Sequence, residues 1–142
     1  MNKLIGLDCN QTTKDECAVK LRDLLQDKCW VQLKTPKDSS GLISESISLE
    51  GYGVVLASSG STGGTKHCFQ PCSHLDQSAE ATSIWLQRQG IEVASCVLFN
   101  PLPLHHVSGL MLWWRSLRWG ATHFWLDSKW MRDPILLEEV CA

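Results

Sequence analysis

Residues 52–66 read Tyr52-Gly53-Val54-Val55-Leu56-Ala57-Ser58-Ser59-Gly60-Ser61-Thr62-Gly63-Gly64-Thr65-Lys66. The stretch begins with a continuous apolar run, which is typical of a parallel strand that helices cover on both faces. It continues with several glycines, which allow positive φ angles and let main-chain N–H groups come close to a ligand. Hydroxyl groups add further donors, and the final lysine carries a mobile charge that suits phosphate. The stretch therefore predicts a buried strand followed by a phosphate-binding loop.

The loop over residues 58–66, called the phosphate loop below, differs from the Walker type. The Walker pattern has Gly, four residues, Gly, Lys and then Ser or Thr. Here Thr65 precedes Lys66 and His67 follows it, so both flanking positions fail. A flexible Gly/Ser linker is the bland alternative. Such a linker would seldom stand between a buried strand and the helix expected after Pro71, and it would seldom end in lysine.

Strand and helix patterns alternate along the rest of the chain. This order predicts an α/β fold with a mostly parallel sheet and flanking helices. We expect Thr13 and Glu16 to form a capping box and Ser73 to cap a later helix. Leu110, Trp113 and Leu117 would share one helix face, Gly120 would end that helix, and Pro134 would stand in the first turn of the last one. The expected elements are a helix over 13–28, a strand over 30–33, a loop over 35–50, a strand over 52–57, a helix after Pro71 that ends at Gly90, a strand over 93–99, a helix over 108–119, a strand over 121–126 and a helix over 133–141.

Composition narrows the class of protein. The chain has 142 residues, enough for one ordinary domain, and its formal net charge of −2 gives no electrostatic reason to expect nucleic acid or an anionic membrane as partner. No apolar run approaches the roughly 20 residues that span a bilayer. Seven cysteines cannot all pair in one disulfide framework. We therefore expect a soluble, cytoplasmic protein with most thiols free. Seven tryptophans predict a Trp-rich core or an aromatic wall beside a pocket or partner.

The phosphate loop resembles the nucleotide-binding signature of the adenylate-forming superfamily, which includes acyl-CoA synthetases, luciferases and peptide-synthetase adenylation domains. That signature is a run of Ser/Thr and Gly that ends in Gly-x-Pro-Lys, and Thr65 stands where the family usually has proline. The resemblance implies that Lys66 is catalytic and stabilises the departing pyrophosphate. It also implies that the nucleotide phosphates are bound by Ser58, Ser59, Gly60, Ser61, Thr62, Gly63, Gly64 and Lys66.

A second stretch reads Leu102-Pro103-Leu104-His105-His106-Val107-Ser108-Gly109-Leu110. It resembles the family element Pro-Leu-aromatic-His-x-x-Gly, which sits beside the acyl-substrate pocket. The resemblance implies a catalytic role for His106 and a pocket lined by His106, Ser108 and Gly109. A purely structural histidine is the alternative for His105 and for His106. The short Pro-Leu-His-His-Val-Ser-Gly-Leu form and the compact N-terminal segment are similar to the o-succinylbenzoate–CoA ligases of menaquinone and phylloquinone synthesis.

The resemblance implies an acid–CoA ligase that uses ATP with bound Mg²⁺, and coenzyme A as co-substrate. We expect no metal site of the protein itself, because Cys68, Cys72 and His74 lack the usual Cys-x2-Cys pairing and no second pair follows. The interpretation divides the chain into an N-terminal helix and loop segment, 1–50, and part of an AMP-binding domain, 51–142.

Later family elements are expected but not found in the sequence. They are Tyr-Gly-x-Thr-Glu, Thr-Gly-Asp and a small C-terminal domain with a catalytic lysine. We therefore expect a fragment, a truncated reading frame or one half of a split enzyme, inactive alone and completed by a missing C-terminal chain. The alternative is a truncated module that binds a nucleotide or a partner without catalysis.

Overall fold

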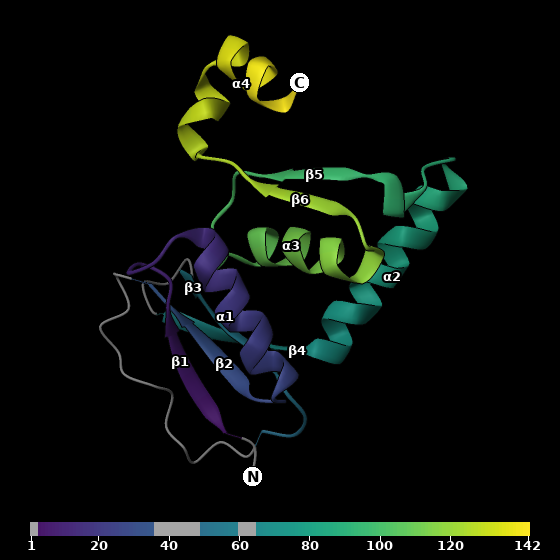
Figure 1. Cartoon of the computed structure of the whole chain (residues 1–142). Helices are drawn as coiled ribbons and strands as arrows, with labels where there is room; N and C mark the ends of the chain where they lie inside the picture. The colour runs from purple at the N-terminus through teal and green to yellow at the C-terminus, as the bar shows by residue number, and fades with distance from the viewer. Residues whose placement is uncertain (1–2, 36–48, 60–64) are drawn as a thin grey trace.

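Two β-sheets organise the part of the chain that the computed structural model describes, residues 3–35, 49–59 and 65–142 without the side chains of Ser59 and Thr65 (Figure 1). The first sheet has the strand order β1-β2-β3-β4, and the second pairs β5 with β6. The strands of the first sheet are β1 (Leu4–Asp8), β2 (Trp30–Lys34), β3 (Gly53–Ser59) and β4 (Thr65–Pro71).

The first sheet is mainly parallel, as the sequence predicts. β1 pairs with β2 and β2 with β3 in parallel register, with Val31 opposite Val54. The sheet thus continues across residue 50, where the proposed division of the chain falls, and that division remains a prediction. β3 is buried at Val54, Val55 and Leu56, which explains the continuous apolar run in this part of its sequence.

Strand β4 was absent from the predicted elements, and the helix predicted after Pro71 follows it as α2 (Cys72–Arg88). The chain turns back after β3, and β4 pairs with it antiparallel from Ser59 opposite Thr65 to Gly53 opposite Pro71. Its polar residues are tolerated because β4 is an edge strand that is half-buried at most of its positions. β1 was also absent from the predicted elements.

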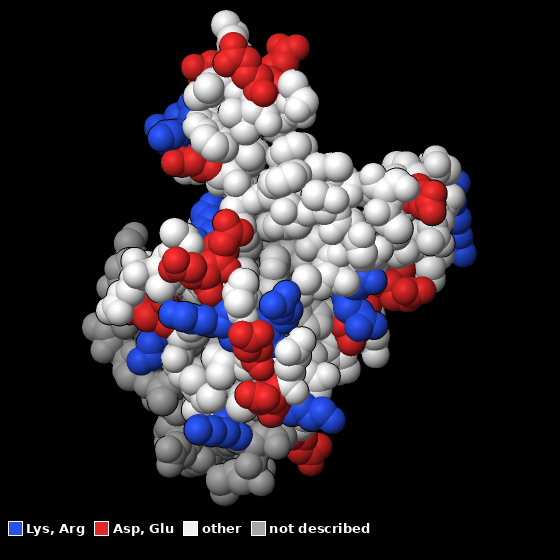
Figure 2. All heavy atoms as spheres, in the orientation of Figure 1, with Lys and Arg blue, Asp and Glu red and all other residues white. Residues whose placement is uncertain are grey.

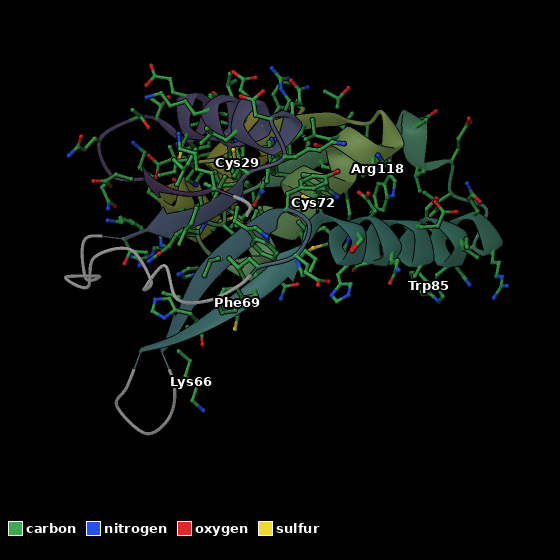
Figure 3. The ribbon with its side chains drawn as sticks, turned by 90° about the horizontal axis from the view of Figure 1, so that it is seen from below. Cys29, Lys66, Phe69, Cys72, Trp85 and Arg118 are labelled. Carbon is green, nitrogen blue, oxygen red and sulfur yellow. The ribbon has the colours of Figure 1, made fainter. Side chains whose placement is uncertain are left out.

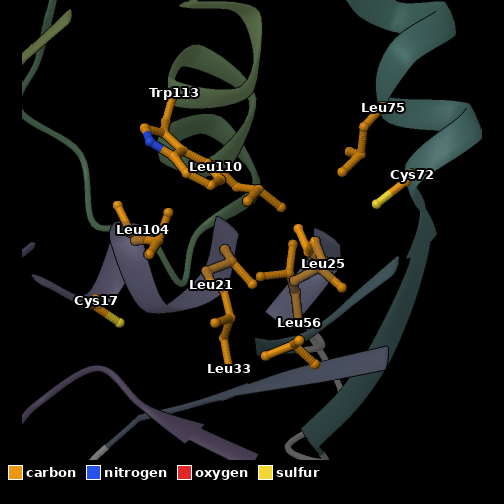
Figure 4. Packing of buried hydrophobic residues seen from close by; sticks show 13 residues of the cluster. Cys17, Leu21, Leu25, Leu33, Leu56, Cys72, Leu75, Leu104, Leu110 and Trp113 are labelled. Carbon is orange, nitrogen blue, oxygen red and sulfur yellow. The ribbon is translucent and has the colours of Figure 1, made fainter. Parts of the chain in front are cut away.

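Helix α1 (Lys14–Gln26) covers one face of this sheet. Thr13 caps it, as predicted, and its hydroxyl accepts a hydrogen bond from the backbone N–H of Glu16 at 3.3 Å. The buried face of α1 packs on the sheet in the main hydrophobic cluster (Figure 4). That cluster contains Cys17, Ala18, Leu21, Leu25, Val31, Leu33, Val54, Leu56, Cys72, Leu75, Leu104, Leu110 and Trp113.

The second sheet is built by β5 (Val97–Asn100) and β6 (Thr122–Trp125), which are parallel and joined through α3 (Val107–Trp119). α3 packs on α2 (Cys72–Arg88), and the Trp119 indole donates a hydrogen bond to the Ala79 carbonyl at 3.0 Å. Gly120 ends α3 with a φ of 67°, a left-handed conformation that favours glycine and confirms the predicted stop. Among the described residues, no helix has both the length and the apolar character needed to span a bilayer.

Two local predictions are wrong. The strand expected over 93–99 begins only at Val97, because a 3-10 turn, η1 (Val93–Ser95), precedes it. The first turn of α2 lacks a side-chain cap, and the residue at the N-cap position is Pro71 rather than Ser73. On α3, Leu110 and Trp113 are buried together with Ser116, whereas Leu117 is 41% exposed.

The chain ends in a 3-10 segment, η2 (Ser128–Arg132), and α4 (Pro134–Cys141), beyond the second sheet in Figure 1. Pro134 is in the first turn of α4, as predicted, and the Asp133 carboxylate caps that turn by accepting a hydrogen bond from the Leu136 N–H at 3.1 Å. Figure 2 shows charged side chains over α1 and α4 and few over β5 and β6. Phe124 of β6 is half exposed and stacks on Phe99 of β5.

Packing of α1 on the sheet predicts a large cost for truncating Leu21. Leu21 is fully buried, whereas Val19 on the same helix is 47% exposed. We expect Leu21→Ala to lower the free energy of unfolding by about 2–5 kcal/mol through lost burial and a residual cavity. Val19→Ala should change it by less than about 0.5 kcal/mol. Urea unfolding measures both, and equal effects would contradict the assigned helix face.

Candidate functional site

The β3–β4 hairpin brings the two ends of the phosphate loop together. Ser58 lies opposite Lys66 in the register, and Ser59 lies opposite Thr65. Gly60, Ser61, Thr62, Gly63 and Gly64 lie outside the described residues, so their predicted roles stay predictions. The paired strands hold the ends of the loop a single strand spacing apart, about 5 Å. Any ligand of this loop would therefore bind at the tip of a hairpin rather than at the start of a helix.

Lys66 is exposed near the start of β4, and in Figure 3 it lies far from the labelled Cys72 and Trp85. Within the described part of the chain it takes part in no ion pair. Ser58, also exposed, has its hydroxyl 4.0 Å from the Cys68 sulfur. An ammonium group without a carboxylate partner keeps its full charge for an anionic ligand. The hairpin can thus present one cation and one hydroxyl beside the loop.

The second predicted element forms the entry to α3. His106 is the N-cap residue of α3 and is exposed, and its ring meets the His105 ring edge-on with centroids 4.7 Å apart. Its carbonyl accepts the hydrogen bond from the Leu110 N–H at 2.9 Å, while its side chain caps nothing. Ser108 is exposed on the first turn. His106 and Ser108 therefore have their polar groups free for solvent or a ligand.

Gly109 is buried, and the packing around it leaves no room for a side chain. A Cβ atom at this position would overlap the carbonyl oxygen of Pro103. The absence of a side chain lets the first turn of α3 lie directly on the backbone of the preceding loop. Glycine in the His-x-x-Gly pattern thus has a packing role here, which exists whether or not the residue also lines a pocket.

Asn100 organises this region and was missed by the sequence prediction. It is fully buried at the end of β5. Its side-chain amide donates to the Gly109 carbonyl at 2.9 Å, and its side-chain oxygen accepts from the Leu102 N–H at 3.1 Å. The amide nitrogen also lies 3.1 Å from Nε2 of His123 on β6. The sequence signal that could have identified Asn100 is the Asn-Pro pair after an apolar strand, because an asparagine side chain commonly forms a hydrogen bond with the backbone two residues further on.

Electrostatics keep two histidines near this loop neutral. Burial lowers the pKa of His123 below its ordinary value of 6.5, and the nearby Asp15 opposes this only in part. Neutral His123 can then accept a hydrogen bond from Asn100 at Nε2. Burial also lowers the pKa of His105, with smaller contributions from His106 and Lys14.

Lys14 links α1 to the carboxyl ends of the second sheet. Its ammonium donates to the carbonyl of Leu126 at 3.1 Å and to that of Pro101 at 3.4 Å, and it lies 5.6 Å from the centre of the Trp125 ring. Burial lowers the pKa of Lys14, and Asp127 acts in the opposite direction. No short-range pattern in the sequence indicates this contact, because it joins residues more than eighty positions apart.

The two predicted elements remain separate in the described structure. No hydrogen bond, ion pair or ring contact between described residues joins Ser58 or Lys66 to His106. The same part of the chain contains no group of three or more His, Cys, Asp or Glu side chains that could hold a metal ion. All seven cysteines are free thiols.

Comparison with known proteins gives matches among solved structures. No protein-family model matches the sequence, and no curated protein matches it. The chain is similar in fold to the o-succinylbenzoate coenzyme A synthetase of Bacillus subtilis in complex with the acyl-adenylate intermediate, with 16% identity, 89% of this chain covered and a TM-score of 0.49. The AMP complex of that enzyme matches with 18% identity, 87% coverage and a TM-score of 0.47. A luciferase-like enzyme of the mealworm Zophobas morio matches with 14% identity, 88% coverage and a TM-score of 0.39.

The chain covers 43% and 42% of the two Bacillus subtilis structures and 31% of the mealworm enzyme. It therefore spans less than half the length of the solved structures that it matches.

The close approach of Gly109 to Pro103 predicts that even alanine is too large at this position. We expect Gly109→Ala to lower the free energy of unfolding by about 1–3 kcal/mol, because the overlapping atom belongs to the backbone and the loop must shift. Ser108→Ala, on the exposed side of the same turn, should change it by less than about 0.5 kcal/mol. Chemical unfolding measures the difference, and a neutral Gly109→Ala variant would contradict this packing.

The lowered pKa of His123 predicts a loss of stability in acid. The unfolded chain binds a proton near pH 6.5 while the folded protein resists it, so the free energy of unfolding falls as the pH drops through that value. His123→Gln, which stays neutral, should flatten this dependence, and the remaining slope would include His105. His74→Gln on the exposed side of α2 is the control and should keep the wild-type slope. Identical slopes for both variants would count against a neutral, half-buried His123.

Proposed function

We propose that this chain is the phosphate-binding part of an adenylate-forming acid–CoA ligase. In that reaction a carboxylate attacks the α-phosphate of Mg-ATP, which gives an acyl-adenylate and releases pyrophosphate. The thiol of coenzyme A then displaces AMP and forms the thioester. The observation that carries the proposal is the signature over residues 58–66, whose two ends pair in a hairpin that leaves Lys66 exposed.

The hairpin suits this chemistry because adenylation depends on positioning and on neutralising phosphate charge. Strand pairing on both sides of the loop limits the motion of its ends, so less conformational entropy is lost when the phosphates bind. Lys66 would stabilise the charge that develops on the departing pyrophosphate. Ser58 and the hydroxyl and N–H groups of residues 59–64 would bind the phosphate oxygens. These roles remain proposals.

The donor set fits a nucleotide triphosphate without a metal site of the protein. Ammonium, hydroxyl and N–H groups are donors for phosphate oxygens. We propose that the Mg²⁺ ion arrives bound to ATP. Magnesium in nucleotide sites commonly keeps several waters and is held largely by the phosphates themselves. Coenzyme A would enter as co-substrate in the second step.

The entry to α3 is the proposed acyl side of the site. His106 and Ser108 have exposed polar groups on the first turn, and Gly109 lets that turn lie against Pro103. We propose that His106 contacts the acid, with Ser108 and Gly109 beside it, and that an aryl acid such as o-succinylbenzoate is the substrate. Menaquinone or phylloquinone synthesis in the cytoplasm would be the setting.

Residues 51–142 would then be part of the AMP-binding domain, with residues 1–50 leading into it. In this proposal the groups that contact adenine and ribose, and the lysine of the small C-terminal domain, come from a further chain segment. Adenylation would require that segment, whereas phosphate binding by the hairpin would not.

The proposed role of Lys66 predicts that Lys66→Ala weakens binding of Mg-ATP. Charge-assisted contacts contribute about 1.5–3 kcal/mol, so we expect the dissociation constant to rise at least about tenfold. Lys20→Ala, which removes an exposed lysine from α1, is the matched control and should leave it unchanged. Isothermal titration calorimetry with Mg-ATP measures both.

The same preparation separates the ligase from a binding module. Exchange of labelled pyrophosphate into ATP that depends on o-succinylbenzoate would support the ligase. Binding of Mg-ATP without such exchange, even after the missing segment is supplied, would favour a non-catalytic nucleotide-binding module. Absence of any Mg-ATP binding by the wild-type chain would refute the proposal.

A further inference from the structure

Two of the free thiols are in direct contact. The sulfur atoms of Cys9 and Cys17 lie 3.1 Å apart, within the range of an S–H···S hydrogen bond. A disulfide has a sulfur–sulfur length of about 2.05 Å, so closing this pair needs a movement of only about 1 Å. The remaining described cysteines, Cys29, Cys68, Cys72, Cys96 and Cys141, have no such sulfur contact.

Rigid elements hold the pair together. Cys9 directly follows β1, and its backbone N–H donates to the Lys34 carbonyl at 3.3 Å, which extends the β1–β2 pairing by one position. Cys17 lies on the buried face of α1, and its N–H donates to the Thr13 carbonyl at 3.0 Å in the first turn. The contact therefore comes from the packing of α1 on the sheet rather than from one flexible segment.

The two thiols differ in acidity and access. The hydrogen bond between them lowers the pKa of Cys17, and the charge of Lys20 acts in the same direction, although burial opposes them. The same contact, together with burial, raises the pKa of Cys9. Cys17 is fully buried, whereas Cys9 is partly exposed. A reagent can thus reach only Cys9 directly, with Cys17 behind it.

We propose that Cys9 and Cys17 form a redox-active pair that closes to a disulfide on reaction with a low-molecular-weight disulfide. The Cys9 thiol gives its proton to solvent, and its sulfur attacks the reagent R–S–S–R and forms a mixed disulfide as the first R–S⁻ leaves. The Cys17 thiol then gives its own proton to solvent, attacks the Cys9 sulfur and expels the second R–S⁻, and the two R–S⁻ groups take up the two protons. The protein loses two electrons and two protons, and the reagent becomes two thiols.

The disulfide would join the end of β1 to the first turns of α1. Lys14 lies between the two cysteines and connects the same part of α1 to the Pro101 and Leu126 carbonyls. Oxidation would therefore fasten α1 to the first sheet close to the residue that links it to the second. We expect the oxidised protein to melt at a higher temperature than the reduced protein, because the bond restricts the unfolded chain.

Trypsin gives a direct readout, because it cleaves after Lys3, Lys14 and Lys20. Cys9 is then in the peptide 4–14 and Cys17 in the peptide 15–20, so only a disulfide keeps the two together. The wild-type chain would be equilibrated with oxidised glutathione, blocked with an alkylating reagent and digested without reductant. We expect the linked peptide to exceed any other cysteine linkage by at least about tenfold, since no other pair starts in contact.

Serine variants test the assignment. Cys9→Ser and Cys17→Ser should each abolish the linked peptide and the rise in melting temperature, while Cys29→Ser, at another half-buried thiol, should keep both. Cys9→Ser, at the partly exposed position, still tests the pair if Cys17→Ser fails to fold. The proposal is overturned if wild-type Cys9 stays as a glutathione adduct, if both thiols remain open to alkylation, or if linkages form among the cysteines without preference.

Discussion

The pairing of β3 on both of its edges is the constraint on which the rest of the structure depends. β3 pairs with β2 in parallel register on one edge and with β4 in antiparallel register on the other. Its buried Val54 and Leu56 contact the cluster that α1 completes, and its end leads into the phosphate loop. One strand thus supports both the core and the proposed binding loop. A change that shifted the register of β3 would move its apolar side chains to the opposite face and separate Ser58 from Lys66.

Local chemistry explains which parts of the fold the sequence predicts. Helix α1 was predicted together with its cap. The C-terminal stop of α3 at Gly120 and the start of α4 at Pro134 were predicted too, because each of these signals depends on residues a few positions apart. β4 was missed because its sequence has no clear apolar pattern and it pairs with a reversed neighbour. β1 was missed although Leu4, Ile5 and Leu7 are apolar, because this short run becomes a strand by pairing with the distant β2. The strand expected over 93–99 was predicted to begin too early, because the apolar pattern reaches back into a 3-10 turn. Val93 in that turn is buried although it belongs to no strand.

The candidate site shows the same division between local and distant information. Motif resemblance finds Lys66, His106 and Gly109, and a steric cause for the glycine is visible in the structure. It does not find Asn100 or His123, whose hydrogen bond joins two strands that are far apart in sequence. A buried asparagine that satisfies a helix carbonyl, a loop N–H and a histidine cannot be recognised from spacing alone. Buried polar groups of this kind need their partners, because an unpaired one costs about 1–3 kcal/mol.

The Lys14 side chain connects α1, which packs on the first sheet, to the second sheet. Carbonyl groups just beyond the ends of a parallel pair have no partner in the sheet, and Lys14 satisfies those of Pro101 and Leu126 just beyond β5 and β6. Burial of an ammonium group is unfavourable, which is why its pKa is lowered, and the two carbonyls and the Trp125 ring offset part of that cost. Because α1 also packs on β2 and β3, one helix connects the sheet that carries Lys66 with the strands that position His106. The spatial relation between the two halves of the proposed site therefore depends on α1, a helix that contains none of the proposed site residues.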